Sequence, residues 1–213
     1  MKENKKKELY ERLVDSYGFS FEKNIFLKSI YSELALDIKN LYVLYSLIKN
    51  KKEQAFYFGD VCVTPNEDTL VLNYKAQNII LDRDETKYFL AQTITIFEDI
   101  LPQGTLVELD IEKIKVPNPS STRLFVVITK RFLGNETEPF YQYGGELYPT
   151  GNYGTGRILL FTPATIKRVV HKGYESEVDN NFVYEIMDEI LVNQHRISMG
   201  FAEEKEVFRW RTK

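Results

Sequence analysis

The sequence is poor in the residues that build disulfides and metal centres. It has one cysteine, Cys62, and two histidines, His171 and His195, among 213 residues. A single cysteine cannot form an intramolecular disulfide, and so few sulfur and imidazole groups exclude a cysteine-rich zinc or iron–sulfur site. We therefore expect no cofactor and a protein that works in the reducing cytoplasm.

Long apolar runs and a large excess of one charge are also absent. The longest apolar stretch, Leu124–Ile128, is far shorter than the roughly 20 residues that span a bilayer. The lysine-rich segment Met1–Arg12 lacks the apolar core of a secretory signal. The 28 lysines and arginines nearly balance the 31 acidic residues, for a net charge of −3. This balance disfavours a general nucleic-acid binder, and the short apolar runs argue against membrane insertion.

Motifs that carry catalysis are missing as well. The glycine-rich stretch 151–156 matches neither type of phosphate-binding loop, so a flexible turn is the favoured interpretation. The sequence contains no G-x-S-x-G nucleophile motif, and Cys62 lies in a strand pattern typical of a buried structural thiol. We expect a non-enzymatic protein. A pocket that joins His171 to several carboxylates would favour an enzyme instead.

The first hundred residues combine helical and strand patterns. Apolar residues recur every three or four positions over 25–48, which predicts one amphipathic helix with a wide apolar face. A shorter helix is expected over Lys7–Ser16, ended by Gly18. Further along, residues 56–63 and 70–74 flank a turn signal and predict a β-hairpin, and residues 79–81 predict a third strand. Asp84 is the expected N-cap of a helix that ends near Pro102.

After Pro102 the pattern is mainly β. Short apolar runs separated by glycine and proline predict five strands, near residues 106–109, 124–128, 140–148, 158–161 and 166–170. Ser176 and Asp179 fit a capping box before a helix that ends near Leu191. We therefore expect an α+β protein in three parts. These are N-terminal helices with a small sheet (1–100), an SH3-like or barrel-like β domain closed by a C-terminal helix (101–192), and a tail (193–213).

Aromatic residues are abundant, with 14 tyrosines and 14 phenylalanines. Tyr143, Tyr148 and Tyr153 lie in an aromatic segment whose neighbours are glutamates rather than the cations that nucleobase stacking requires. Tyrosine-rich surfaces are common in protein interfaces, so these three residues are candidate protein-binding residues, with Phe208 and Trp210 of the tail. The alternative is that most of these rings fill the barrel. The apolar face of 25–48 is a second candidate interface.

Two sequence elements of the second half resemble a known family. The first is Tyr148-Pro149-Thr150-Gly151-Asn152, and the second runs from Phe161 through Ile166 to Gly173-Tyr174 before an acidic helix. Together with the order of strands from Leu101 to Leu191, they resemble the bacterial family called domain of unknown function 4176. Members of this family occur in type VII secretion gene clusters of Gram-positive bacteria, beside LXG toxins. The resemblance implies a toxin-associated accessory protein and supplies no catalytic residue.

The expected function is therefore that of a cytoplasmic, non-enzymatic targeting factor or chaperone. Its expected partner is a type VII-secreted LXG-type toxin or a small helical partner protein of that toxin. The alternative is an immunity protein that blocks a cognate toxin, since a net acidic chain suits a basic nuclease target. The sequence leaves this choice and the oligomeric state open.

Overall fold

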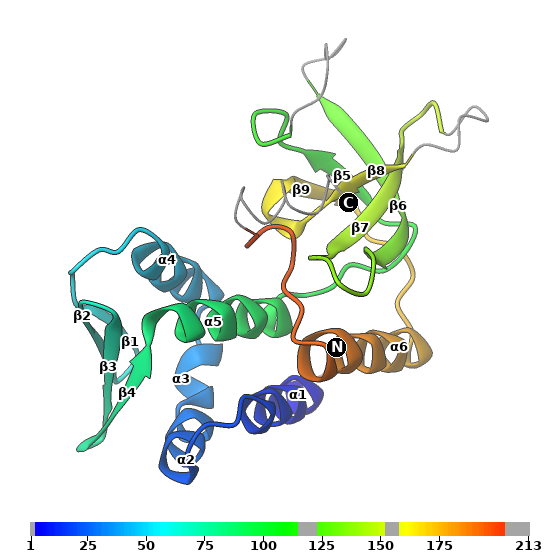
Figure 1. The fold of residues 1–213 in the computed structure, drawn as a ribbon. Helices are drawn as coiled ribbons and strands as arrows, with labels where there is room; N and C mark the ends of the chain where they lie inside the picture. Colours follow the sequence, from blue (N-terminus) through cyan, green and yellow to red (C-terminus); the bar gives the residue numbers. More distant parts are fainter. Residues whose placement is uncertain (1–2, 115–122, 152–157, 203–213) are drawn as a thin grey trace. The chain divides into compact units, whose positions relative to one another are not determined.

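The chain forms two compact units in the computed structural model (Figure 1). Unit 1 consists of Met1–Asp99 with Met187–His195, and unit 2 consists of Ile100–Ile186 with Arg196–Lys213. The structure describes residues 3–114, 123–151 and 158–202. The division after Asp99 lies next to the expected boundary, whereas residues 187–195 group with the N-terminal part.

Four helices open unit 1. They are α1 (Glu3–Ser16), α2 (Phe21–Ser29), α3 (Tyr31–Ala35) and α4 (Ile38–Lys49). The predicted helix over Lys7–Ser16 is confirmed within α1, and Gly18 follows it with a φ of +67°. The single helix predicted over 25–48 is wrong, because the chain breaks at Ile30 and at Asp37. Asp37 has extended backbone and its carboxylate accepts a hydrogen bond from the Lys39 N–H at 2.9 Å, so it starts a new helix.

A four-stranded antiparallel sheet follows, in the order β1-β2-β3-β4. Its strands are β1 (Phe56–Phe58), β2 (Val61–Asn66), β3 (Thr69–Tyr74) and β4 (Gln77–Asp82). One face is buried through residues such as Val63, Leu72 and Leu81. The opposite face carries the exposed Tyr57 and the half-buried Cys62, so Cys62 is not the buried thiol that the strand pattern suggested.

Helix α5 (Arg83–Phe97) follows β4 without a loop. Its N-cap is Asp82, whose Oδ1 accepts from the Glu85 N–H at 2.9 Å. The expected cap Asp84 is wrong, since Asp84 already lies inside the first helical turn. An aspartate at either position 82 or 84 fits the residue preference for N-caps. The end of β4 at Asp82 decides that Asp82 caps α5.

Residues 187–195 belong to unit 1 because of their contacts with its helices. They include η2 (Asp188–Asn193), a π-helical turn. The Leu191 carbonyl accepts from Gln92 Nε2 of α5 at 3.1 Å, and Asp188 pairs with Arg12 of α1 at 2.9 Å. In the aromatic core of unit 1, the ring of Tyr10 of α1 lies 6.0 Å from that of Phe89 of α5.

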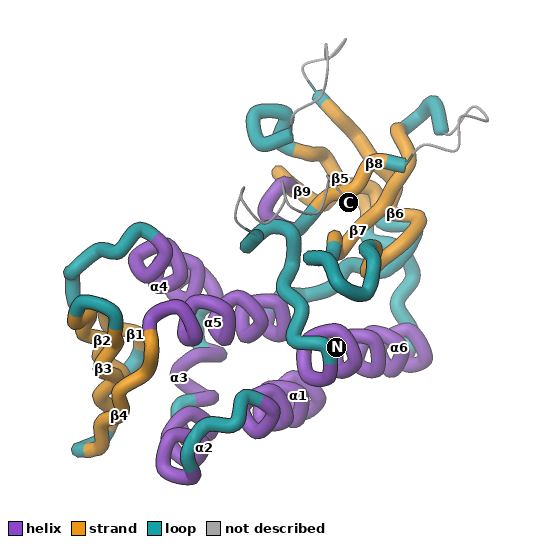
Figure 2. Tube along the Cα trace, in the orientation of Figure 1, coloured by secondary structure: helices purple, strands orange, loops and turns teal. Residues whose placement is uncertain are grey.

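Unit 2 is built on a five-stranded antiparallel sheet in the order β8-β7-β6-β5-β9 (Figure 2). The strands are β5 (Leu106–Leu109), β6 (Leu124–Leu133), β7 (Tyr141–Leu147), β8 (Leu159–Phe161) and β9 (Ile166–His171), with the 3-10 turn η1 (Pro163–Thr165) before β9. The five predicted strands and the α+β class are confirmed. Among the described residues the sheet does not close into the expected barrel, because β8 and β9 lie at its opposite ends.

The core of unit 2 lies on one face of this sheet. It comprises Val107, Leu109, Val126, Ile128, Tyr143 and Phe161. These residues come from β5, β6, β7 and β8, so a single apolar layer holds the central strands together. Alternate residues along the same strands face the other way, which brings Glu108 of β5 to the opposite face.

Helix α6 (Glu177–Met187) completes the described elements. Ser176 caps it, since its Oγ accepts from the Asp179 N–H at 3.1 Å, as the sequence predicted. The predicted end near Leu191 falls inside η2, where the helical path continues as a π-helical turn. Within the described ranges, no helix combines the length and apolarity needed to cross a membrane.

Candidate protein-binding surface

Exposed apolar side chains are concentrated in residues 166–182 of unit 2. Five of them define what we call the β9–α6 surface: Val169, Val170, Tyr174, Val178 and Phe182. Tyr174 is 86% exposed and Val178 is 77% exposed, unusually high values for large apolar residues. Val169 and Val170 are neighbours in β9 and point to opposite faces of the sheet, whereas Val178 and Phe182 are four residues apart and share one face of the following helix.

Strand β9 lies at the edge of the sheet. It pairs with β5, with Leu109 opposite Ile166 and Leu106 opposite His171. No strand of the described residues pairs with its other side. An edge strand leaves a row of backbone N–H and C=O groups available to a further strand. Val169 and Val170 therefore lie on a strand that offers both apolar side chains and backbone hydrogen bonds.

A cluster of charges fixes β9 to the sheet. The carboxylate of Glu108 is 3% exposed and accepts hydrogen bonds from Arg168 Nε at 2.7 Å and Arg123 Nη2 at 2.9 Å. Lys167 Nζ lies 3.6 Å from the same carboxylate. Hydrogen bonds from Arg123 and Arg168 lower the pKa of Glu108 to about 2. Three cations therefore lie within hydrogen-bond or ion-pair distance of one carboxylate and tie β9 to β5.

The chain then crosses from β9 toward β6. The Gly173 N–H donates to Thr105 Oγ1 at 3.0 Å, just before β5 begins. A Cβ atom on Gly173 would lie 2.2 Å from the Gln103 carbonyl oxygen, so only glycine permits this close approach. The crossing holds Tyr174, the next residue, out in solvent.

Helix α6 is attached to β6 through Arg131. This guanidinium is only 4% exposed and binds the Asp179 carboxylate through two hydrogen bonds of 2.5 Å and 3.2 Å. It also lies 5.5 Å from the ring centre of Phe182. Paired guanidinium–carboxylate bonds restrict orientation. The start of α6 is thereby held so that Val178 points into solvent.

The predicted site residues have different environments. Tyr143 is completely buried, its ring 5.4 Å from that of Phe161, and its hydroxyl accepts from the Leu101 N–H at 3.1 Å. Tyr148 follows β7 and is 56% exposed. The structure does not bring these two tyrosines together at one surface. Tyr153, Phe208 and Trp210 lie outside the described residues.

The second predicted interface, over residues 25–48, is mostly core. Phe26, Ile30 and Leu41 are buried, which the division into three helices allows. Phe21 and Leu36 stay exposed in unit 1, and a hollow between α2 and β4 is lined in part by Phe21 and Ile79.

Sequence reasoning did not single out the β9–α6 surface. Val178 and Phe182 belong to an apolar series that predicts a helix, but the buried residues of α6 are Val183 and Met187. The exposed pair Val178 and Phe182 and the buried pair Val183 and Met187 are each four residues apart, so both pairs match the period of a helix. The consecutive apolar residues Val169 and Val170, with Tyr174 close behind, were a usable signal of exposed apolar side chains. Neighbouring residues of a strand point to opposite faces, so they cannot all pack into one core.

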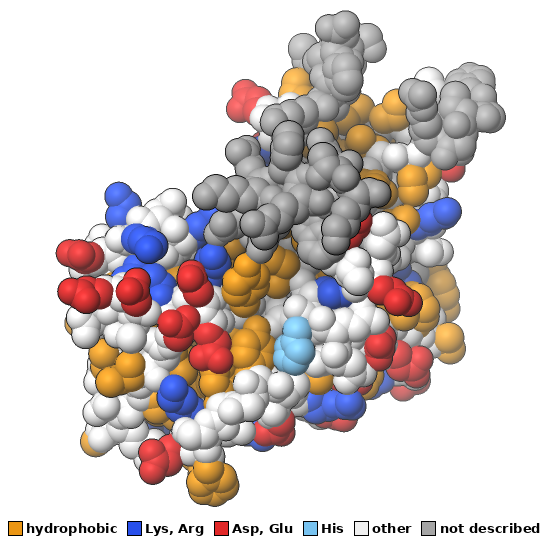
Figure 3. All heavy atoms as spheres, in the orientation of Figure 1, with side chains coloured by type: hydrophobic (Ala, Val, Ile, Leu, Met, Phe, Trp, Pro, Cys, Tyr) orange, Lys and Arg blue, Asp and Glu red, His pale blue; other side chains and the backbone are white. Residues whose placement is uncertain are grey.

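Charges elsewhere do not form a field of one sign. Lys, Arg, Asp and Glu side chains are interspersed on the face seen in Figure 3, with hydrophobic patches among them. The small net charge of −3 agrees with this mixture. The overall charge of the protein therefore generates little long-range electrostatic steering.

Comparison with known proteins gives one family match. No curated protein and no solved structure matches the chain. The matched segment, residues 100–182, lies within unit 2 and contains all five residues of the β9–α6 surface. This segment matches the family described as "Domain of unknown function (DUF4176)", which confirms the family resemblance of the second half of the chain.

Proposed function

We propose that this protein is a non-enzymatic binding protein that holds a type VII-secreted LXG-type toxin, or a small helical partner of that toxin, in the cytoplasm for export. Its role is that of a targeting factor or chaperone. The observation that carries the proposal is the position of the β9–α6 surface inside the segment matched to the DUF4176 family. The family resemblance suggests the toxin, and the surface offers a means of binding it.

The chemistry of the surface suggests what the partner segment contains. Tyr174 and Val178 would contribute apolar contact area, with polar groups around them as in a typical interface. Arg123, Lys167 and Arg168 contact the carboxylate of Glu108, whereas Glu175 and Glu177 flank Tyr174 and Val178 in sequence. We therefore expect a partner segment with apolar side chains flanked by charges of both signs, because complementary charge favours association and register.

Co-purification with a defined toxin tests this function. Tagged protein is co-expressed with an LXG-type toxin from its native host and passed through size exclusion. We expect the toxin to co-elute, and the double variant Tyr174→Ala/Val178→Ala to weaken binding at least about tenfold. The matched control is Tyr57→Ala/Ile80→Ala, which removes exposed side chains (68% and 55%) from the sheet of unit 1, outside both candidate interfaces.

Failure of the toxin to co-elute would contradict the proposed function. Equal loss of binding in both double variants would contradict the assignment to the β9–α6 surface. Truncation of the toxin then separates the targeting role from the alternative, an immunity protein. A targeting factor binds the secretion-signal region, whereas an immunity protein binds the toxic domain.

A further inference from the structure

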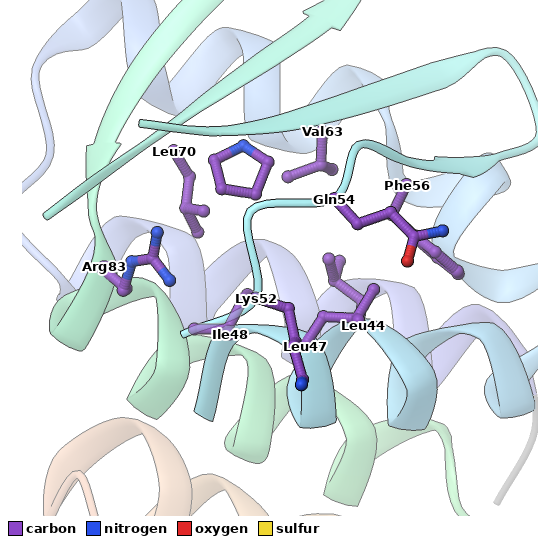
Figure 4. A pocket seen from close by; sticks show the side chains of 10 residues that line it. Leu44, Leu47, Ile48, Lys52, Gln54, Phe56, Val63, Leu70 and Arg83 are labelled. Atoms are coloured by element: carbon purple, nitrogen blue, oxygen red, sulfur yellow. The ribbon is translucent and has the colours of Figure 1, made fainter. Parts of the chain in front are cut away.

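Unit 1 contains a small cavity between α4 and the sheet (Figure 4). Its apolar lining includes Leu44, Leu47 and Ile48 of α4, with Phe56, Val63 and Leu70 of the strands. Pro65 and three polar residues, Arg83, Lys52 and Gln54, complete the lining. In Figure 4 the guanidinium of Arg83 lies at one end of this set and Gln54 at the other.

Arg83 is buried without complete hydrogen bonding. The residue is 5% exposed, and its Nε and Nη1 atoms have no hydrogen-bond partner. The neighbouring carboxylates have other contacts, since Asp82 caps α5 and Asp84 lies 3.6 Å from Lys87. An arginine side chain keeps its positive charge in proteins. A buried charge with unpaired donors is costly unless another group compensates it.

The lining favours an anion over water as the compensating group. Arg83 and Lys52 can only donate hydrogen bonds, the acceptor oxygen of Gln54 lies at the far end from Arg83, and the other seven lining residues are apolar. A buried water needs acceptors for its own protons as well as donors, and it is stable with two to four polar partners. An anion needs donors alone, and its charge offsets that of the guanidinium.

The size of the cavity limits the anion. The cavity has a volume of about 10 Å³. This is enough for one particle of about the size of a water molecule. We propose that this cavity binds a single small inorganic anion of the size of chloride at the Arg83 guanidinium. Lys52 and Gln54 are exposed lining residues, so they provide the route of entry. The site is independent of the binding function proposed above.

Thermal unfolding in matched salts tests the site on the full-length protein. Sodium chloride is compared with sodium gluconate, whose anion is too large for the cavity, at equal ionic strength. We expect the midpoint of the wild-type protein to be about 3 °C higher when chloride exceeds its dissociation constant about tenfold. Arg83→Met is expected to have equal midpoints in both salts. Lys49→Met, which removes an exposed cation of α4, is the control and should keep the wild-type difference.

Crystals soaked in bromide give a second, independent readout. The expected result is an anomalous peak within hydrogen-bond distance of Arg83 Nε or Nη1. The proposal would be overturned if the wild-type protein unfolded at the same midpoint in both salts. It would also be overturned if bromide peaks appeared only at the surface and an ordered water lay at Arg83. If Arg83→Met does not fold, the bromide peak in the wild-type protein decides by itself.

Discussion

Tyr143 and Tyr148 lie close in sequence but have opposite environments. Tyr143 is fully buried in the core of unit 2, while Tyr148, just beyond the end of β7, is 56% exposed. Tyr143 lies in the middle of β7, where the strand is buried, whereas Tyr148 lies beyond its exposed end at Leu147. At the residue scale, the two tyrosines therefore separate a side chain that packs in the core from one that faces solvent.

Tyr143→Phe should weaken folding and leave partner binding unchanged. The substitution removes the hydroxyl that accepts from the Leu101 N–H at 3.1 Å, which we expect to cost about 1 kcal/mol of unfolding free energy. Denaturant unfolding measures this loss, and co-elution with the toxin measures binding. Tyr148→Phe is the control, with a stability change below about 0.5 kcal/mol. Loss of binding in folded Tyr143→Phe would instead place Tyr143 in the interface.

Glu108 predicts a pH dependence of stability. Its pKa falls from an ordinary 4.5 to about 2 in the folded protein because Arg123 and Arg168 bind its carboxylate. A lowered folded-state pKa contributes stability above the unfolded-state pKa, and this contribution is lost as the pH falls toward 2. The free-energy difference between wild type and Glu108→Gln should be constant between about pH 7 and 5 and shrink below about pH 4.5. A difference that does not change down to pH 2.5 would contradict this assignment.

At the scale of elements, single carboxylates decide where helices of unit 1 begin. Asp37 separates α4 from α3, and Asp82 joins β4 directly to α5. Each accepts a hydrogen bond from a backbone N–H that would otherwise lack a partner. Such short-range bonds redirect the chain even where the apolar period continues without interruption.

Asp82→Ala and Asp84→Ala should therefore differ in stability. The first removes the cap on the Glu85 N–H and should cost about 1 kcal/mol. The second removes a carboxylate that is 81% exposed and lies 3.6 Å from Lys87, a surface pair worth less than about 0.5 kcal/mol. Urea unfolding of both variants checks this order. Equal losses would argue against Asp82 as the cap.

At the scale of the whole molecule, the chain order does not match the division into units. Residues 187–195 are assigned to unit 1 although unit 2 separates them from it in sequence. Leu191 is fully buried, and its carbonyl accepts from Gln92 of α5. Folding of unit 1 therefore depends on a segment that follows most of unit 2.

Leu191→Ala and Leu109→Ala should weaken different units. Both side chains are buried, at 0% and 1% exposure, and each substitution should cost about 2–5 kcal/mol. Hydrogen–deuterium exchange should rise in α1 and α5 for Leu191→Ala and in β5–β7 for Leu109→Ala, because each cavity forms in one unit. Each variant is the control for the other. Increased exchange of β5–β7 in Leu191→Ala would show that the two units unfold together.

Several features of this protein followed from local sequence pattern. The five strands of unit 2, the helix in α1 and the cap at Ser176 were predicted because alternation, apolar period and capping are short-range properties. The same pattern failed at residues 25–48, where Asp37 interrupts an unbroken apolar series. It also failed at α6, where the series through Val178 and the buried series through Val183 have the same period.

The sequence by itself determined the class of fold and the resemblance of the second half to one family, since both depend on the order of local elements. Only the tertiary structure decided that the β sheet stays open, that Tyr143 is core and that Val178 is exposed. It also placed Arg83 against a cavity formed by α4 and three strands. These outcomes depend on which distant residues meet, and the spacing of residues along a chain does not record such contacts.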